Sequence, residues 1–503
     1  MLEKTARKQT YYTDRKESIS NMKPKIIEFK HVNFTYEGCE KRALQDVNFS
    51  IDEGSIIFIN GKSGSGKSTL LNILNGIIPE VIEGELEGEV LIDGRQNLTI
   101  AERSLILGNV FQNPRSQFFT TDTTAELVFA MENYGFPKKE MVCRLHSIID
   151  EFKVAHLQDR SLFGMSSGER QLIALLTVLI MNPKVIIFDE PSANLDYGNA
   201  MRLRKQLKTL KKQGKTVIVA DHRYFYLQGM VDKFLLIENK TVLCFETEQS
   251  FLNSAYRNRS SDLFHSDYGR RKICKTTEIG LKIEHLTYKN ILKDINLEVN
   301  KHEATTIVGI NGVGKTTLAE LISGAVKNYD GTITAFDEKS GARKANSIRA
   351  LYILQDADFQ LFGATCLKEL EITRKNSAEN MLALELLNLD RLKDHHPQSL
   401  SGGEKQRLQM AISMVSNNQI IIFDEPTSGL DQASMARVIE MIERLKKDRT
   451  IIIISHDYEF IRQVSDTIVY LKDGSICDKF YLEDGNIEKL NTIYKEMEAY
   501  YES

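Results

Sequence analysis

The nine residues from Gly61 to Thr69, GKSGSGKST, constrain the fold of this chain more than any other feature. They match the phosphate-binding pattern G-x-x-x-x-G-K-[ST]. An apolar run stands just before them and a segment with helical apolar spacing follows, so the motif joins a strand to a helix. Glycines let the backbone wrap round an anion, and the N–H groups at the helix start point at it. We therefore expect a P-loop, with Lys67 at the β- and γ-phosphates and Ser68 on Mg²⁺.

The chain repeats this motif together with everything that follows it. A second P-loop, GINGVGKTT, begins at Gly309, which is 248 residues after Gly61. Both halves then continue with a glutamine, a serine–glycine motif, an apolar run ending in Asp-Glu, and a histidine. The two histidines, His222 and His456, are 234 residues apart, because the second half is shorter between its P-loop and its serine motif. A near-constant offset with one motif order indicates an internal duplication.

Length and composition limit the alternatives. A chain of 503 residues is long enough for more than one domain. Its formal net charge of -4 argues against a strongly basic nucleic-acid binder and against an acidic disordered chain. The six cysteines are scattered, without the spacing of a metal or iron–sulfur site. No apolar run approaches the ~18 residues of a membrane-spanning helix. We expect a soluble protein with reduced thiols and no nucleic-acid partner.

Each half contains an apolar run that ends in two carboxylates, Asp189-Glu190 in the first and Asp424-Glu425 in the second. Apolar runs this dense fit parallel strands that are buried on both faces. Ligands of such sheets bind at the carboxyl ends of the strands, so we expect both acidic pairs beside the P-loops. We interpret the two aspartates as Mg²⁺ ligands and the two glutamates as general bases for an attacking water.

The complete set of motifs resembles the ATP-binding cassette family over roughly residues 24–250 and 280–480. The second half carries LSGGE, residues 400–404, which is close to the family signature. The resemblance implies an α/β fold with two P-loop NTPase cassettes, each with a RecA-like parallel-sheet core, an antiparallel β subdomain and a helical subdomain. It further implies ATP-dependent, head-to-tail pairing of the two domains, with each ATP between one P-loop and the opposite signature. A serine and glycine amides at a helix start suit that role, because they form a second anion cradle.

The resemblance also assigns roles by position. The glutamines match a residue that touches Mg²⁺ and the attacking water, and the histidines match a switch at the γ-phosphate. The segments 192–196 and 428–431 match the loop that links the two sites. The catalytic residues implied are Glu190, Glu425, His222, His456, Gln112 and Gln355. The Mg²⁺ ligands implied are Ser68, Gln112, Asp189, Thr316, Gln355 and Asp424. The ATP contacts implied are Tyr36, Gly61, Lys62, Ser63, Gly64, Ser65, Gly66, Lys67, Ser68, Thr69, Ser166, Gly168, Tyr288, Gly309, Ile310, Asn311, Gly312, Val313, Gly314, Lys315, Thr316, Thr317, Ser401, Gly402 and Gly403, with the two tyrosines stacked on adenine.

The first half departs from the family pattern at one position. It reads MSSGE, with Ser167 where the family usually has glycine. The extra hydroxymethyl group could crowd the ATP bound at the second P-loop. We hypothesise that the site of Lys315 and Glu425, which this signature would complete, is the slower of two competent sites.

The glutamine segments narrow the choice of partner. Residues 111–119, FQNPRSQFF, look like the F-Q-N-P-x-x-Q-aromatic run of energy-coupling-factor importers, where it grips the coupling helix of a transmembrane protein. Residues 354–362, LQDADFQLF, are a looser copy, and Asp221-His222-Arg223 resembles that family's histidine loop. The resemblance implies the ATPase subunit of an importer for a vitamin, a vitamin precursor, or cobalt or nickel. It would act at the cytoplasmic face of the cell membrane, with a coupling-helix protein and a substrate-binding membrane protein as partners.

Two alternatives stay open. The fused ATPase of a sugar importer has a similar layout, but its second P-loop tends to be degenerate, and here GINGVGKT is intact. A ribosome-binding translation factor has a long charged helical linker, whereas residues 251–278 form a short stretch rich in Ser, Arg and Asn.

The expected organisation is a flexible leader (1–23), a first cassette (24–250), a linker (251–279), a second cassette (280–482) and a helical C-terminal tail with no assigned role (483–503). The alternating segment 87–94, EGEVLIDG, predicts a hairpin.

Overall fold

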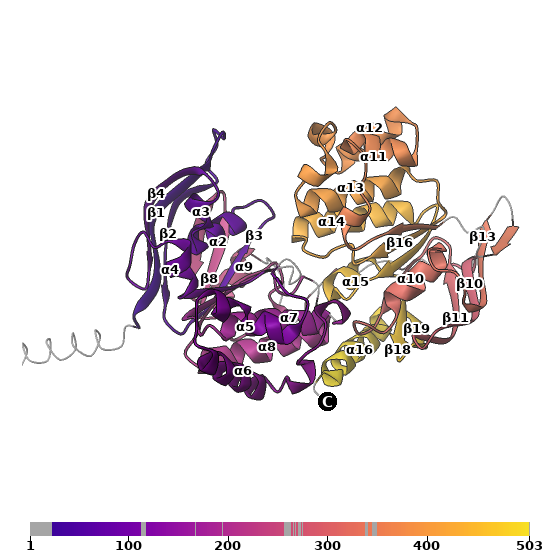
Figure 1. Cartoon of the computed structure of the whole chain (residues 1–503). Helices are drawn as coiled ribbons and strands as arrows, with labels where there is room; N and C mark the ends of the chain where they lie inside the picture. The colour runs from indigo at the N-terminus through magenta and orange to yellow at the C-terminus, as the bar shows by residue number, and fades with distance from the viewer. Residues whose placement is uncertain are drawn as a thin grey trace, which may run out of the picture.

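The computed structural model describes residues 23–111, 117–165, 167–193, 195–255, 263–264, 266, 268–269, 273, 275–337, 341–344 and 350–501. Residues 1–22 of the expected leader, much of the expected linker, and the site residues Gln112 and Ser166 lie outside these residues. The described residues form two similar domains that lie side by side (Figure 1). None of their helices is long and apolar enough to cross a membrane.

The first domain is built round a six-stranded sheet with the order β5-β6-β7-β3-β8-β9, in which only β9 runs antiparallel to its neighbour. Successive side chains of the central strand pack on opposite faces: Ile57 and Ile59 against α2, and Ile56 and Phe58 against α7 and α8. This two-sided burial explains why the strands read as continuous apolar runs. The strands are β5 (Leu107–Val110), β6 (Val185–Asp189), β7 (Thr216–Ala220), β3 (Ile56–Gly61), β8 (Lys233–Glu238) and β9 (Thr241–Phe245).

A three-stranded antiparallel sheet with the order β2-β1-β4 covers one side of this core. Its strands are β1 (Lys25–Tyr36), β2 (Leu44–Asp52) and β4 (Gly84–Ile92). The predicted hairpin at 87–94 is wrong. Those residues belong to the single strand β4, which pairs with β1 from Tyr36↔Gly84 to Ile27↔Ile92. Beyond the turn at Asp93 only one bridge forms, from Ile92 to Arg95, because the distant β1 supplies the ladder.

The helices of the first domain surround the six-stranded sheet and form the helical subdomain. In that subdomain α5, α6 and α7 share one apolar core, and the carboxylate of Asp122 caps α5 by accepting from the N–H groups of Thr124 and Ala125. The helices are α2 (Lys67–Asn75), α3 (Ile77–Glu80), α4 (Ile100–Ser104), α5 (Thr123–Asn133), α6 (Lys138–Phe152), α7 (Ser167–Leu179), α8 (Tyr197–Lys212) and α9 (Glu248–Ala255).

The second domain repeats this architecture, which confirms the fold class expected from the sequence. Its parallel sheet has the order β15-β16-β17-β12-β18-β19 and its antiparallel sheet the order β11-β10-β13-β14. The strands are β10 (Ile279–Tyr288), β11 (Leu292–Asn300), β12 (Ala304–Val308), β13 (Asp330–Asp337), β14 (Gly341–Lys344), β15 (Ala350–Ile353), β16 (Ile420–Asp424), β17 (Thr450–Ile454), β18 (Thr467–Lys472) and β19 (Ser475–Tyr481). The helices are α10 (Lys315–Ser323), α11 (Cys366–Thr373), α12 (Ser377–Leu386), α13 (Gly402–Val415), α14 (Gln432–Leu445), α15 (Tyr458–Val464) and α16 (Ile487–Tyr500). The second half is shorter between its glutamine and its serine motif because two helices are shorter there. Helices α11 and α12 have 8 and 10 residues, whereas α5 and α6 have 11 and 15.

The C-terminal helix α16 crosses from the second domain onto α8 of the first (Figure 1). Gly198 in α8 makes this contact possible, because a Cβ there would meet the backbone of Met497 and the ring of Tyr501. Tyr197, Tyr494 and Tyr458 form an aromatic cluster at the same junction. The tail that the sequence left without a role is therefore part of the interface between the domains.

Candidate functional site

Each P-loop joins the central strand of its sheet to a helix. Gly66 and Gly314 are the N-caps of α2 and α10, with φ of 110° and 108°. A side chain at that φ is strained, so glycine is required there. Lys67 and Lys315, each 6% exposed, fold back so that their ammonium groups donate to the first carbonyls of their own loops, at 2.9 Å (Gly61) and 2.8 Å (Gly309). Burial lowers the pKa of both lysines, and the nearby carboxylates oppose the shift.

The strand order places the acidic pairs next to the P-loops, as expected from the sequence. In each sheet one strand separates the strand before the P-loop from the strand that ends in Asp-Glu. Glu190 and Glu425 adopt left-handed φ values of 45° and 48°. Non-glycine residues rarely adopt this conformation, and such strain concentrates at functional sites. Their N–H groups donate across the sheet, to the carbonyls of Ala220 at 2.7 Å and Ile454 at 2.9 Å. The strained backbone is thus held in place by the neighbouring strand.

Of the aspartates beside these glutamates, Asp424 is buried and Asp189 is half-buried. Burial raises the pKa of Asp189 to about 6, and the charge of Glu190 adds to the shift. Burial also raises the pKa of Asp424 to about 6, although Tyr352 and Thr316 donate hydrogen bonds to its carboxylate at 2.7 and 3.1 Å and oppose the shift. A buried carboxylate next to a P-loop hydroxyl fits Mg²⁺, which binds proteins through one or two carboxylates and otherwise through water and phosphates.

The histidines predicted to be switches contact the glutamates predicted to be general bases, but the two sites differ in detail. In the first site, His222 Nε2 lies 3.3 Å from Glu190 Oε1 and 3.2 Å from the ammonium of Lys67. In the second site, the other ring nitrogen makes the contact, with His456 Nδ1 2.6 Å from Glu425 Oε1. Burial favours the neutral form of Glu425, but the hydrogen bond from His456 and the charges of Lys315 and Arg223 outweigh burial and lower the pKa of this carboxyl group.

Each domain also contacts the P-loop of the other. Asp431 accepts a hydrogen bond from the backbone N–H of Ser63 at 2.8 Å, and Asp196 accepts one from the N–H of Asn311 at 2.8 Å. These aspartates end the two segments expected to link the sites. Tyr501, beyond the end of α16, donates a further hydrogen bond to Asp196 at 2.8 Å. The domains are therefore paired head to tail through charged groups at both P-loops.

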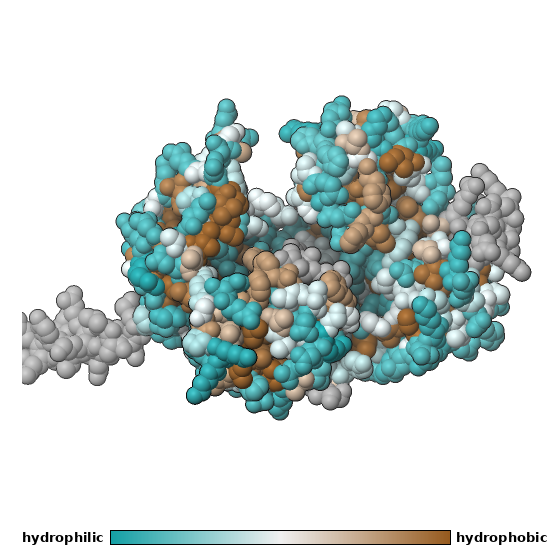
Figure 2. All heavy atoms as spheres, viewed as in Figure 1, coloured by the Kyte–Doolittle hydropathy of each residue, from teal (hydrophilic) through white to brown (hydrophobic). Residues whose placement is uncertain are grey.

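A cavity of about 1000 Å³ lies between the domains, where Figure 2 shows the surface hollowed. The second P-loop, Glu425, the exposed Gln355 and the second signature all line it. A Cβ built on Gly403 would lie 3.8 Å from Ser63 Oγ, so the second signature faces the first P-loop. Residues of α7, which begins in the first signature, line the cavity together with Asn311 of the second P-loop. The structure thus brings each P-loop and the opposite signature helix together; the contacts of Ser166 and the side chain of Ser167 lie outside the described residues.

The residues present fit ATP and Mg²⁺ on structural grounds. The hydroxyl oxygen of Ser65, inside the first P-loop, is buried and has no hydrogen-bond partner among the described residues. The loop amides, two buried lysines and buried carboxylates supply the donors and ligands that phosphates and Mg²⁺ require. Tyr36 lies beside the first P-loop, with its hydroxyl 2.7 Å from Thr69 Oγ1. Tyr288 is half-buried, and the ammonium of Lys289 lies 4.9 Å from its ring centroid. Adenine stacking by these tyrosines stays a prediction.

The sequence did not reveal several residues of this site. The second glutamine of each glutamine segment braces the loop: Gln117 Oε1 accepts from Phe111 N at 3.3 Å, and Gln360 Oε1 accepts from Leu354 N at 3.1 Å. The hydroxyl group of Tyr352 donates a hydrogen bond to Asp424, and no motif in the sequence indicates this contact. The equal spacing of the two glutamines in both segments was a usable signal for the braces.

Comparisons with known proteins agree with this geometry. The family model described as ABC transporter matches residues 44–193 and 292–428, more than half of the chain. A Treponema denticola protein named "Putative ABC transporter ATP-binding protein" is 36% identical over 486 residues, which cover 92% of this chain and 98% of that one. A Bacillus subtilis protein named "Putative HMP/thiamine import ATP-binding protein YkoD" is 28% identical over 517 residues, covering 92% and 94%. The solved structure named "RNase-L Inhibitor" is 21% identical with a TM-score of 0.62 over 92% of each chain, and it shows a likeness in fold.

Proposed function

The chain belongs to the family of ABC transporter ATP-binding proteins, and from this premise we propose that it is the fused ATPase subunit of an energy-coupling-factor importer. Its cargo would be a vitamin, a vitamin precursor, or cobalt or nickel. It would work at the cytoplasmic face of the membrane with a coupling-helix protein and a substrate-binding membrane protein. ATP hydrolysis is the activity that the family implies.

One observation gives the main support for a membrane partner. Phe119 and Phe362 each lie seven residues after the glutamine of their half, and they are 75% and 76% exposed. The carboxylates of Glu126 and Glu369 hold these phenylalanines by accepting from their N–H groups, at 3.0 and 2.7 Å. A large apolar side chain that stays exposed on a backbone anchored by a buried acid favours a docking role. It occurs at equivalent positions of both domains, as a pair of coupling helices would require.

The relatives and the glutamine braces support the same proposal. The Bacillus subtilis relative carries the word import in its name and matches nearly the full length of this chain. Gln117 and Gln360 connect each docking loop to its signature helix, because their side-chain amides donate to Ala174 in α7 and to Tyr352, and Gln360 also accepts from Gln409 in α13. Movement of a docked helix would therefore reach the ATP sites.

The residues present account for the chemistry of hydrolysis. Bound Mg²⁺ would neutralise charge on the transferring phosphate. Glu190 and Glu425 would accept the proton of the attacking water, and Lys67 and Lys315 would place a positive charge at the phosphates.

The test is affinity purification from detergent-solubilised membranes, in a Glu190→Gln/Glu425→Gln background that binds ATP without turning it over. A Phe119→Asp/Phe362→Asp variant removes both docking side chains. The matched control is Leu382→Asp, which changes a side chain of α12 that is 56% exposed. Thermal unfolding of each purified variant reports whether it is folded.

The proposal predicts that two integral membrane proteins co-purify with the parent and with the Leu382 variant, and that the double Phe variant loses them. Their identity would name the cargo class. Co-purification that survives the double Phe substitution would overturn the docking assignment. Recovery of ribosomal proteins in place of membrane proteins would favour the translation-factor alternative.

A further inference from the structure

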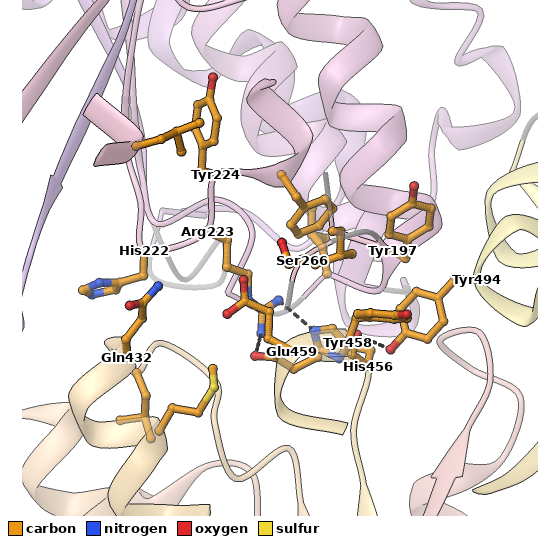
Figure 3. A pocket seen from close by; sticks show the side chains of 17 residues that line it. Tyr197, His222, Arg223, Tyr224, Ser266, Gln432, His456, Tyr458, Glu459 and Tyr494 are labelled. Carbon is orange, nitrogen blue, oxygen red and sulfur yellow. Dashed lines mark hydrogen bonds and ion pairs between the residues drawn. The ribbon is translucent and has the colours of Figure 1, made fainter. Parts of the chain in front are cut away.

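Arg223 is a residue of the first domain whose side chain belongs to the second ATP site. It follows His222 at the end of β7, and its guanidinium points out of its own domain towards His456 (Figure 3). One nitrogen donates to Asp457 Oδ2 at 3.0 Å. Another donates to His456 Nε2 at 3.3 Å and to the carbonyl of Ser192 at 3.2 Å. The side chain is only 18% exposed, so these contacts are largely shielded from water.

Arg223 and Asp457 occupy equivalent positions of the duplicated chain, since each follows the switch histidine of its domain. The pair therefore joins the two histidine loops across the pseudo-two-fold axis. Two arginines or two aspartates at these positions would repel each other, whereas one of each attracts. The complementary charges make the contact asymmetric: from this position His456 of the second domain receives a guanidinium, whereas the first domain receives only a carboxylate bound to Arg223 itself.

The guanidinium determines which nitrogen of His456 carries the proton. Arginine has only donors, so His456 Nε2 must accept from it with a lone pair. The carboxylate of Glu425 has only acceptors, so the proton lies on Nδ1 and points at Glu425 at 2.6 Å. A ring in this tautomer has no Nε2–H to donate to a phosphate oxygen. In the first site, His222 Nε2 instead faces Glu190 and Lys67.

We propose that Arg223 is a positioning residue that acts in trans on the second ATP site: it holds His456 in the Nδ1–H tautomer and makes this site the slower of the two. The proposal rests on the ATP hydrolysis assigned to the family and is independent of the membrane partners. It assigns the asymmetry to an observed contact across the interface, in addition to the substitution at position 167.

The first test compares the two sites in the purified chain. Glu190→Gln leaves the second site as the source of turnover, and Glu425→Gln leaves the first. In both backgrounds we would introduce Arg223→Met/Asp457→Asn, which removes both charges together and keeps an acceptor for the cap of α15, where Asp457 Oδ1 accepts from Phe460 N at 3.2 Å. The proposal predicts that the ratio of second-site to first-site turnover rises about ten-fold, the equivalent of one charge-assisted hydrogen bond. A ratio within two-fold of the parent, or a lower one, overturns it.

A charge swap separates positioning from simple clamping. Arg223→Asp/Asp457→Arg keeps the attraction between the domains but moves the guanidinium to the second domain, next to the histidine loop of the first domain. The proposal predicts that the ratio inverts, so that the site of Glu190 becomes the slower one. A swapped protein that pairs its domains and keeps the parental ratio would show that the pair is only an interface clamp.

A third measurement does not depend on activity. The ¹⁵N shifts of the imidazole ring distinguish the two tautomers in histidine-labelled protein, and His456→Gln assigns the signal. The parent should show protonated Nδ1, and Arg223→Met/Asp457→Asn should populate protonated Nε2. Arg144→Met is the matched control, because Arg144 pairs with Glu140 inside α6. Protonated Nε2 in the parent would refute the proposal, whereas absence of any hydrolysis by the wild type would refute the ATPase assignment instead.

Discussion

The aspartates that reach across the domain interface give the sharpest test of how the two domains pair. In Asp431→Asn, the amide oxygen can still accept from Ser434 N and cap α14, which Asp431 Oδ1 does at 2.7 Å. The second oxygen, which accepts from Ser63 N at 2.8 Å, is replaced by an NH₂ group that faces another donor. The substitution therefore removes the cross-domain contact while leaving the helix cap in place.

The size of the effect follows from the type of bond. A hydrogen bond from a backbone N–H to a carboxylate contributes ~1.5–3 kcal/mol, and a loss of about 2 kcal/mol corresponds to roughly 30-fold in an equilibrium constant. Burial opposes the charge of Asp431, but the hydrogen bonds from Ser63 and Ser434 outweigh it and lower its pKa below 3.8. The charge is thus present above pH 3.8 and is lost only as the pH falls through the lowered pKa. The effect should be the same at pH 6 and pH 8.

The assay measures closure of the two domains by fluorescence energy transfer between dyes on α6 and α12, in the Glu190→Gln/Glu425→Gln background. The quantity compared is the ATP concentration at which half of the molecules are closed. Asp431→Asn should raise this midpoint roughly 30-fold. Asp122→Asn is the control, because that residue caps α5 within the helical subdomain. A midpoint within two-fold of the parent would refute the assignment of pairing energy to this contact.

Three further predictions follow from the buried groups. Asp424 has a raised pKa of about 6, so its native carboxylate costs stability as the pH rises from about 4 to above 6. Without Mg²⁺ or ATP, denaturant titration should show that the unfolding free energy of Asp424→Asn, relative to that of the wild type, is about 2 kcal/mol more favourable at pH 7.5 than at pH 4.5. The wild type loses this amount over the same pH range, because its buried carboxyl group ionises, and the variant does not. Gly198→Ala should cost ~1–3 kcal/mol by the same measurement, because the new methyl group meets α16, and Gly485→Ala, where a Cβ meets nothing within 4 Å, controls for the loss of a glycine. Glu190→Gln should reduce steady-state ATP turnover more than Glu425→Gln; equal losses would contradict unequal sites.

The sequence was sufficient for the fold class, and the roles that it predicts for the residues of the ATP sites stay predictions. Strands buried on both faces read as apolar runs, and a glycine loop between such a strand and a helix with one apolar stripe is typical of a P-loop, so β3, β6 and α2 were predictable. The hairpin at 87–94 failed because alternation shows that a segment is a strand but not which strand it pairs with. In β4 the partner is β1, more than fifty residues away at the Ile27↔Ile92 register.

The tertiary structure alone decided how the two halves act on each other. Arg223 and Asp457 are 234 positions apart, and Ser63 and Asp431 are 368 apart, so no local pattern reports their contact. The same holds for α16, whose residues form an ordinary amphipathic helix until it docks on α8. Periodicity and motif spacing record the forces within one turn, strand or loop. Contacts between domains depend on the shape and charge of surfaces that exist only after each domain has folded. The sequence therefore predicted two ATP sites that differ at position 167, and the docking of the domains added the contact of Arg223 with His456 as a second difference.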